Sequence, residues 1–421
     1  MLRVFEAFAG VGTQRMALRN LGIPHEVVGI SEINPYAIQS YEAIHGKTAN
    51  FGDISKINPI HLPDFDLFTY SFPCQDLSTA GKQRGMIRGE TRSGLLYECE
   101  RIIECKRPNY LLLENVKNLV GKNFKPAFDD WLTYLESLGY TNYWQILNAK
   151  DYGIPQHRER VFVVSILGEH KPYTFPSEQP LTTKWADFLE DEVPNNLYLK
   201  RNYQVTIDSP ILDSSLINKQ PLIKTEFQSM DHGDIRIKKL FNVNPSGRGM
   251  NGFVFDSQGL CPTVTTNKGE GLKVLVEKPI GTIYQVASNE WGYHSLNHSI
   301  ASVVGAWVYP ISPFLALPNE TISLNVSPHS DYPTAKFNPN DWFRKQLMPS
   351  TPSDLTSGLV TLLTARKLSA KESWRLMGMT DDDYEKVKAA GISNTQIFYQ
   401  SGNAIVVNVL EAIFKELFPT P

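Results

Sequence analysis

The amino-acid sequence predicts an α/β fold with a second, irregular domain inserted ahead of its C-terminal helices. Over the first 167 residues, short apolar segments of strand character alternate with helical patterns, which is typical of an α/β sheet. From about residue 171 to 352 the alternation gives way to short strand-like pieces and clustered Pro, Asn, Ser and Gly. Helical periodicity then returns. We therefore expect a first part of the catalytic domain at 1–170, a middle domain at 171–354 and C-terminal motifs at 355–421.

The strands of the expected sheet are marked by apolar runs in the first part of the chain. They are Leu2–Phe8, Val27–Ile30, Leu67–Phe72, Tyr110–Leu113 and Val161–Ile166. Near the C-terminus, Ser369–Met377 has the pattern of one helix, and Ile405, Val409 and Ile413 lie on one face of another. A last helix this apolar is expected to dock on the N-terminal sheet, so that both ends of the chain close one domain.

The composition of the 421 residues is that of a soluble globular protein. Hydrophobic residues make up 42% and charged residues 20%, which excludes a disordered chain and a coiled coil. The formal charge of −3 excludes a positive field over the whole molecule, so a nucleic-acid groove would have to be local. Four cysteines without CxxC pairing and no secretory leader predict a cytoplasmic protein without a metal site. The charge-free stretch Trp291–Asn319 is long enough to span a membrane, but Pro310 and Pro313 argue against that interpretation.

A glycine pair after the first strand indicates a ligand at the start of a helix. Phe8 precedes Gly10 and Gly12, and Glu32 closes the second strand twenty residues later, where an acidic side chain grips ribose hydroxyls in this architecture. Arg15 stands where a dinucleotide fingerprint needs a third Gly, and no Lys-Ser/Thr follows Gly12. A nucleoside without pyrophosphate, such as S-adenosylmethionine, therefore fits better. A plain tight turn and a solvated carboxylate are the alternatives.

Two reactive side chains are expected at the carboxyl ends of the next strands. Cys74 comes directly after the strand 67–72 and is placed like a nucleophile, the alternative being an inert buried thiol. Glu114 ends the strand that begins at Tyr110. Held against apolar strands, its carboxyl could keep a raised pKa and donate a proton to a ring nitrogen. The alternative is a helix-capping carboxylate.

Gln156, Arg158 and Arg160 precede the last strand and alternate, so they are expected to share one face. The arginine pair suits a phosphate or a carbonyl group, or else a surface cluster of salt bridges.

The motifs together resemble those of the DNA cytosine-5 methyltransferase family of prokaryotic and phage restriction-modification type. The matching segments, in order, are Phe8-Ala9-Gly10-Val11-Gly12, Pro73-Cys74-Gln75, Glu114-Asn115-Val116, Gln156-His157-Arg158-Glu159-Arg160 and Gly402-Asn403. They cover about residues 2–167 and 355–417. The resemblance implies an S-adenosylmethionine-dependent fold with a mixed seven-stranded sheet, and a smaller target-recognition domain in the middle region. An insertion at about 276–354 lengthens that region, between a strand at 262–266 and the conserved helix expected at 363–378.

The resemblance also implies an activity, sequence-specific methylation of C5 in a cytosine flipped out of double-stranded DNA. Cys74 would attack C6 of the ring while Glu114 protonates N3. Arg158 and Arg160 would support them, one orienting Glu114 and the base carbonyl and the other the neighbouring backbone. A companion restriction endonuclease, a monomeric state and a bacterial or phage-encoded cytoplasmic protein are expected with it.

Further site residues are carried over from the family, position by position. The cofactor site would comprise Phe8, Gly10, Gly12, Glu32, Ile33, Asp53, Ile54, Pro73, Leu95, Asn403 and Ala404. Contacts to DNA are expected from Gln75, Ser78, Asn115 and Gln156 in the matching motifs. Arg248 is a further candidate, because it lies in a Gly-Arg-Gly turn of the middle region, as expected of a loop that reaches into a groove. At Ala404 the family usually has Ser, so a polar contact to the methionine end of the cofactor would be lost or taken over by water.

Other functions remain open at the level of sequence. The tRNA-methylating branch of the family shares the same motifs, although the large middle region favours duplex DNA. A non-catalytic nucleic-acid-binding relative disagrees with the intact Cys74, Glu114 and Arg158. An NAD-dependent oxidoreductase lacks support because the third Gly is missing.

Overall fold

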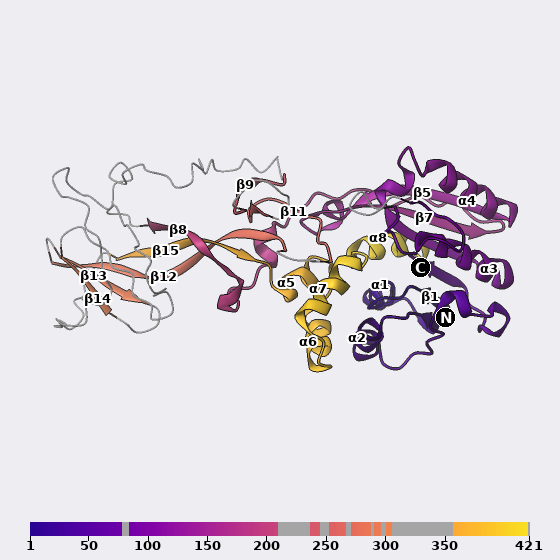
Figure 1. Ribbon diagram of the computed structural model, residues 1–421, viewed down its shortest axis with the longest axis horizontal. Coiled ribbons are helices and arrows are strands. Elements are labelled where there is room, and N and C mark those ends of the chain that lie inside the picture. The colour runs from indigo at the N-terminus through magenta and orange to yellow at the C-terminus, as the bar shows by residue number, and fades with distance from the viewer. Residues whose placement is uncertain are drawn as a thin grey trace.

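A mixed six-stranded sheet forms the centre of the catalytic half in the computed structural model (Figure 1). The structure describes residues 1–77, 84–208, 236–244, 252–266, 271–287, 290–295, 300–304 and 357–419. In the order β2-β1-β3-β4-β7-β5, the strands of this sheet are β2 (His25–Ser31), β1 (Leu2–Ala7), β3 (Leu67–Tyr70), β4 (Tyr110–Val116), β7 (Glu159–Leu167) and β5 (Tyr140–Asn148). The predicted α/β class is confirmed. Seven strands were expected and the sheet has six. On the outer side of β2 the structure has an isolated bridge between Ile30 and Asn50.

Strand direction brings the candidate site residues to one edge of the sheet. Strands β1 to β4 run parallel, whereas β7 is antiparallel to both of its neighbours, β4 and β5. The carboxyl ends of the parallel strands therefore meet the amino end of β7. Val116 at the end of β4 is paired with Arg160 at the start of β7.

Helices cover both faces of this sheet because successive strand residues point to opposite sides. Phe5, Phe68 and Leu111 pack in a cluster with α3 (Leu96–Lys106) and α4 (Lys125–Ser137). Their neighbours Val4 and Leu67 lie in a second cluster, with α1 (Thr13–Asn20) and residues of the C-terminal helices. Helix α2 (Pro35–His45) follows β2 and begins with the side-chain oxygen of Asn34 as its cap.

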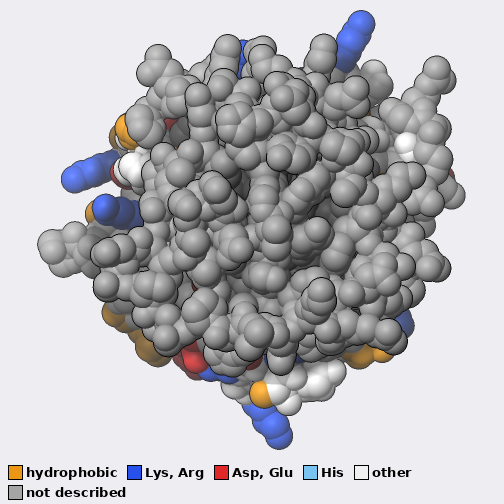
Figure 2. Space-filling model, turned by 90° about the vertical axis from the view of Figure 1, so that its left-hand side faces the viewer, with side chains coloured by type: hydrophobic (Ala, Val, Ile, Leu, Met, Phe, Trp, Pro, Cys, Tyr) orange, Lys and Arg blue, Asp and Glu red, His pale blue; other side chains and the backbone are white. Residues whose placement is uncertain are grey.

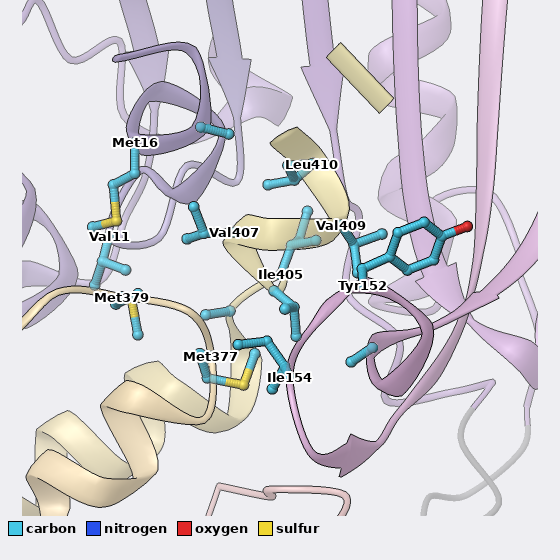
Figure 3. Packing of buried hydrophobic residues seen from close by; sticks show 14 of the residues in the cluster. Val11, Met16, Tyr152, Ile154, Met377, Met379, Ile405, Val407, Val409 and Leu410 are labelled. Carbon is cyan, nitrogen blue, oxygen red and sulfur yellow. The ribbon is translucent and has the colours of Figure 1, made fainter. Parts of the chain in front are cut away.

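The C-terminal helices pack against the half of the molecule that holds the six-stranded sheet. They are α5 (Ala370–Arg375), α6 (Asp381–Ala389), α7 (Asn394–Asn403) and α8 (Val407–Leu417). Figure 3 shows Val407 and Leu410 of α8 packed towards Met16 of α1. Among the described residues, the stretch Asn394–Leu417 is long and apolar enough to cross a membrane, and more than half of its apolar 18-residue window is buried within the protein.

The helix expected at 363–378 is shorter than predicted. A capping box between Ser369 and Glu372 begins α5, and residues 363–366 before it belong to the strand β15 (Ser357–Lys367). These residues are strand because β15 pairs with β12 (Lys273–Ala287) over nearly its whole length. That partner lies about eighty residues earlier in the chain and gives no local signal in the sequence.

The middle region is built from strands where it is described. A seven-stranded sheet combines β12 and β15 with β8 (Tyr198–Asp208), β9 (Lys239–Asn242), β10 (Phe253–Asp256), β13 (Glu290–Ser295) and β14 (Ile300–Val304). Strands β8, β12 and β15 lead away from the catalytic half, and β13 and β14 lie at the far end (Figure 1). Seen from that end, described side chains form only the rim of the surface, with Lys and Arg projecting at several points (Figure 2). The charge-free stretch after residue 304 lies outside the described residues, and the domain limits remain a prediction.

Short elements complete the described chain. A two-stranded parallel pair joins β6 (Gln156–His157) of the catalytic half to β11 (Cys261–Pro262) of the middle region. Single turns of 3₁₀ helix are η1 (Ile54–Lys56), η2 (Pro59–His61), η3 (Ser93–Leu95), η4 (Lys117–Val120), η5 (Ala149–Tyr152), η6 (Trp185–Phe188) and η7 (Asn195–Leu197).

Candidate active site

The glycine loop after β1 has a backbone conformation that only small residues adopt freely. Gly10 and Gly12 have φ angles of 57° and 77°, and Phe8 has the unusual value of 55° for a residue with a side chain. A Cβ atom on Gly12 would lie 2.6 Å from the side chains of both Tyr41 and His45. Because Gly12 has no side chain, Tyr41 and His45 can pack directly against the loop. Gly12 is also the N-cap residue of α1.

The carboxylate of Glu32 ties this loop to the start of α2. Its Oε2 accepts a hydrogen bond from Gly10 N at 2.9 Å, and its Oε1 accepts from Ile33 N and Asn34 N, both at 2.8 Å. Oε2 can therefore accept a second hydrogen bond, and Glu32 lines the cavity. The sequence placed Glu32 correctly at the strand end, but these backbone contacts give it a structural role as well.

A cavity of about 1060 Å³ opens at the carboxyl edge of the sheet. It collects most of the predicted site residues from segments that are far apart in the sequence. On its wall are Phe8, Gly10, Glu32, Ile33, Asp53, Ile54, Pro73, Cys74, Gln75, Leu95, Glu114, Asn115, Arg158, Arg160, Asn403 and Ala404. Gly12 was expected to contact the cofactor, but it lies behind the wall, against Tyr41 and His45.

The wall of the cavity suits a nucleoside with a charged amino-acid tail. Asp53 Oδ1 accepts hydrogen bonds from Ser55, which lower the pKa of this carboxyl and keep it ionised. Its Oδ2 is left to accept from a ligand amine, since only Lys56 approaches it, at 3.9 Å. Ile33 is 71% exposed and offers an apolar surface beside Glu32 for a flat base. These acceptors fit the ribose hydroxyls and the adenine amine of S-adenosylmethionine.

The segment that carries Cys74 is held from two sides. Asn115 at the end of β4 donates from Nδ2 to Phe72 O at 3.0 Å. Ser93 donates from its hydroxyl to Pro73 O at 2.6 Å. Two carbonyls directly before Cys74 are thus fixed, and its thiol stays on the cavity wall. Asn115 was predicted to contact DNA, but its buried amide is engaged within the protein.

Glu114 and Arg160 form an ion pair at the same edge. Arg160 Nε lies 3.2 Å from Glu114 Oε1, and the glutamate is 8% exposed. Burial raises the pKa of Glu114 above its ordinary value, although the nearby charges of Arg160 and Arg158 oppose the shift. The direction agrees with the sequence-based expectation of a carboxyl that can donate a proton.

The thiol of Cys74 is not activated by its surroundings alone. Burial and, after it, the negative charge of Glu114 raise the pKa of Cys74, while Arg160 and Arg158 oppose this. The thiol form therefore dominates at neutral pH. When Glu114 is protonated, its repulsion of the thiolate disappears and both guanidinium groups favour ionisation of Cys74.

The hydrogen bonds of Arg158 and Gln156 are made within the protein, although Arg158 also lines the cavity. Arg158 donates to Val264 O at 2.9 Å, to Gly402 O at 3.0 Å and to Ala404 O at 2.9 Å. Burial lowers the pKa of Arg158 to about 9, so it is still a cation at neutral pH. Gln156 was expected to contact DNA, and the structure gives its side chain partners within the protein. Its side chain is fully buried and hydrogen-bonded to backbone, outside the cavity wall.

The remaining predicted DNA contacts are partly described. Gln75 lies on the cavity wall and accepts a hydrogen bond from Arg92 at 2.8 Å. Ser78 and Arg248 lie outside the described residues. In the described part of the chain, no cluster of three or more His, Cys, Asp or Glu side chains is placed to hold a metal ion.

Several cavity residues were missed at the level of sequence. Tyr36 and Tyr399 line the cavity, and Gln400 connects their helices by accepting from Ser40 Oγ and donating to Tyr36 O. Asp76, which the sequence indicated only as part of a polar loop, is buried and accepts from Arg92 N and the Arg84 side chain. The Gln-x-Gly-Asn pattern ending at Asn403 could have pointed to Gln400, but nothing local marks the others.

Comparisons with known proteins agree with this geometry over the whole chain. The family profile of the C-5 cytosine-specific DNA methylases matches residues 2–419. The chain is 36% identical to the type II methyltransferase M2.ScrFI of Lactococcus lactis subsp. cremoris, over 99% of both proteins. It is 31% identical to the orphan methyltransferase M.SPRI of Bacillus phage SPR, over 100% of this chain and 98% of the phage protein.

Solved structures share the fold. The methyltransferase EhMeth of Entamoeba histolytica superimposes with a TM-score of 0.58 at 15% identity, over 99% of this chain and 98% of that protein. The Dnmt2 methyltransferase of S. pombe gives a TM-score of 0.56 at 18% identity, over 99% and 97%. At these identities the likeness establishes the fold.

Proposed function

The chain belongs to the family of C-5 cytosine-specific DNA methylases and is a DNA cytosine-5 methyltransferase, and on that premise we propose which of its residues carry out the reaction. One observation carries the assignment. Cys74, Glu114 and Arg160 meet on the wall of the same cavity as the glycine loop and Glu32. A nucleophile, a proton donor and a nucleoside site are thereby within reach of one another.

S-adenosylmethionine is the methyl donor that we propose for the cavity, and when bound it supplies an electrophilic methyl group. Glu32 Oε2 would accept from a ribose hydroxyl, and Asp53 Oδ2 from the adenine amine. Asn403 donates its amide to Tyr399 O, which leaves its Oδ1 as an acceptor for the ammonium of the amino-acid tail. Ile33 and Phe8 would enclose the base.

Cys74 is the proposed nucleophile, and Glu114 the proposed proton donor. The Sγ of Cys74 forms a bond to C6 of the cytosine while the Glu114 proton passes to N3, so that no negative charge builds up on the ring. C5 becomes nucleophilic and takes the methyl group. A base then removes the C5 proton, the electron pair of the Sγ–C6 bond returns to Cys74 as a thiolate, and N3 gives its proton back to Glu114. These steps release neutral 5-methylcytosine. Arg160 holds Glu114 at the correct place, by the ion pair at 3.2 Å.

The substrate that we propose is a short specific sequence in double-stranded DNA, with the target cytosine flipped into the cavity. The relatives named as type II and orphan methyltransferases support this class of substrate. The type II relative suggests a companion restriction endonuclease. We further propose a cytoplasmic monomer, since one chain carries every residue of the cavity.

The first test is bisulfite sequencing of DNA from an expression host that lacks its own cytosine methylation. Methylated cytosines confined to one short motif are expected. Cys74→Ala should lower methylation at that motif by at least about 10⁴-fold, as for loss of other nucleophiles. A duplex with 5-fluorocytosine at the motif should trap the wild-type chain covalently, because fluorine cannot leave C5 as a cation. Turnover by Cys74→Ala, or the absence of a trapped complex, would contradict the assignment of Cys74.

A further inference from the structure

One segment of the middle region runs into the active-site cavity. It consists of residues 261–266, beginning with β11, which pairs with β6 of the catalytic half. Cys261 N donates to Pro155 O at 2.8 Å, and the Thr263 hydroxyl donates to His157 O at 2.6 Å. The segment ends at Thr266, which lines the cavity. It is therefore a direct link between the recognition region and the site of chemistry.

Both polar groups of one peptide residue in this segment are held by buried side chains. The N–H of Val264 donates to Gln156 Oε1 at 2.9 Å, and its carbonyl accepts from Arg158 Nη1 at 2.9 Å. Gln156 is 0% exposed and Arg158 is 3% exposed. Gln156 is itself fixed, because its Nε2 donates to Leu376 O at 2.7 Å, after α5. Directional bonds on both sides of Val264 fix its position more narrowly than apolar packing would.

The same guanidinium group also binds the C-terminal segment that lines the cavity. Arg158 Nη2 donates to the carbonyls of Gly402 and Ala404, which flank the proposed cofactor residue Asn403. Gly402 also touches the segment closely, since a Cβ atom there would lie 2.4 Å from Thr265 C and Thr266 N. Arg158 therefore joins three parts of the chain. They are the active-site strand, the recognition region and the C-terminal helices.

We propose that Gln156 and Arg158 are positioning residues, which clamp the Val264 peptide and so set where the recognition region holds DNA relative to Cys74. The proposal rests on the proposed function and names a part of the chain that controls delivery of the target base. A cytosine bound about 1 Å away from its productive position reacts far more slowly, by a factor of about 10². Loosening the clamp therefore lowers the rate of methyl transfer while the cofactor pocket keeps its own contacts.

The experiment compares two full-length glutamine variants with wild type. The substrate is unmethylated duplex DNA that contains the motif found by bisulfite sequencing. Gln156→Met keeps the length of the side chain and removes the hydrogen bonds to Val264, Leu376 and Met377. Gln145→Met is the matched control, on the exposed face of β5. We expect kcat/KM for DNA to fall about tenfold or more in Gln156→Met. The dissociation constant for S-adenosylmethionine should stay within about twofold of wild type, and the control should match wild type in both.

A second variant separates positioning from a merely structural loss. In Gln156→Glu the protonated carboxyl can donate to Leu376 O and accept from Val264 N, whereas the carboxylate cannot donate. The activity of Gln156→Glu relative to wild type should therefore rise as the pH is lowered, and that of Gln156→Met should not change with pH.

Three results would overturn the clamp. They are equal kcat/KM values in Gln156→Met and Gln145→Met, a parallel loss of cofactor affinity in Gln156→Met, and a pH-independent defect in Gln156→Glu. Failure of the proposed function would be seen separately, as a wild-type chain that leaves the duplex unmethylated.

Discussion

Two buried glutamates at the same edge of the sheet have raised pKa values and different surroundings. Glu114 lies on the cavity wall, beside Arg160 and Arg158. Glu6 on β1 is fully buried behind the glycine loop, where it accepts from the Tyr41 hydroxyl at 2.6 Å. Burial raises the pKa of Glu6 to about 7, and Tyr41 and the charge of Arg15 oppose the shift.

The difference between these regions shows that a raised pKa does not identify a catalytic carboxyl by itself. Glu114 has counter-charges and access to a ligand, whereas Glu6 has neither an ion pair nor a place on the cavity wall. Tyr41 and His45 pack directly under Gly12. Burial lowers the pKa of His45 to about 3, so its ring is neutral at physiological pH. One ring nitrogen can then donate a hydrogen bond and the other can accept one. We interpret the Glu6 region as support for the glycine loop.

The most direct test of this difference between Glu114 and Glu6 is to make the same substitution in both. Glu114→Gln should lower kcat for methyl transfer by about 10² to 10⁴-fold, because the amide cannot protonate N3 of the cytosine. Glu6→Gln should remain within about fivefold of wild type, since its amide can still accept from Tyr41. Single-turnover methylation of duplex DNA measures both. Equal losses in the two variants would mean that Glu6 takes part in the reaction.

The next effect is on stability and belongs to Glu6. Because its pKa in the folded protein is raised from 4.5 to about 7, the folded state binds the proton more tightly than the unfolded chain. The stability that Glu6 contributes is fully present below pH 4.5 and is lost as the pH rises through about 7, a loss of roughly 3 kcal/mol. His45 acts in the opposite direction between about pH 3 and 6.5, so the wild-type curve combines both effects.

The measurement is the difference in free energy of unfolding between Glu6→Gln and wild type, from urea titrations at several pH values. This difference cancels the contribution of His45 and should shift by about 3 kcal/mol in favour of Glu6→Gln between pH 4.5 and 8. A difference that does not change with pH would show that Glu6 titrates normally.

The smallest of these effects concerns the acidic side chain that does face a ligand. Glu32→Ala should weaken binding of S-adenosylmethionine about tenfold, equivalent to 1.4 kcal/mol, because it removes an acceptor for the ribose and the tie to Gly10 N. Glu26→Ala, on the exposed side of the same strand, is the control and should bind as wild type does. Isothermal titration calorimetry gives both constants, and an unchanged constant for Glu32→Ala would contradict the ribose assignment.

Much of the catalytic half could be predicted because its signals are local. An apolar run followed by Gly10, Cys74 or Glu114 marks a strand and the residue at its carboxyl end, and parallel strands bring such ends to one edge. The observed strand ends nevertheless differ from the predicted ones by a few residues. Strand β4 extends to Val116 because it pairs with β7 beyond its apolar residues. Residues 363–366 were misassigned because their partner is distant in sequence.

The sequence by itself determined the α/β class, the chain order of the motifs and the side chains that we propose as reactive, since these depend on residue type and on short-range periodicity. Only the tertiary structure decided what Gln156, Arg158 and Glu6 do. Their partners lie 35 to 246 residues away. Burial against those partners places Gln156 and Arg158 on backbone groups of distant segments and gives Glu6 the Tyr41 hydroxyl as its partner. Hydrogen-bond geometry and desolvation depend on what surrounds a group in space, which no local pattern records.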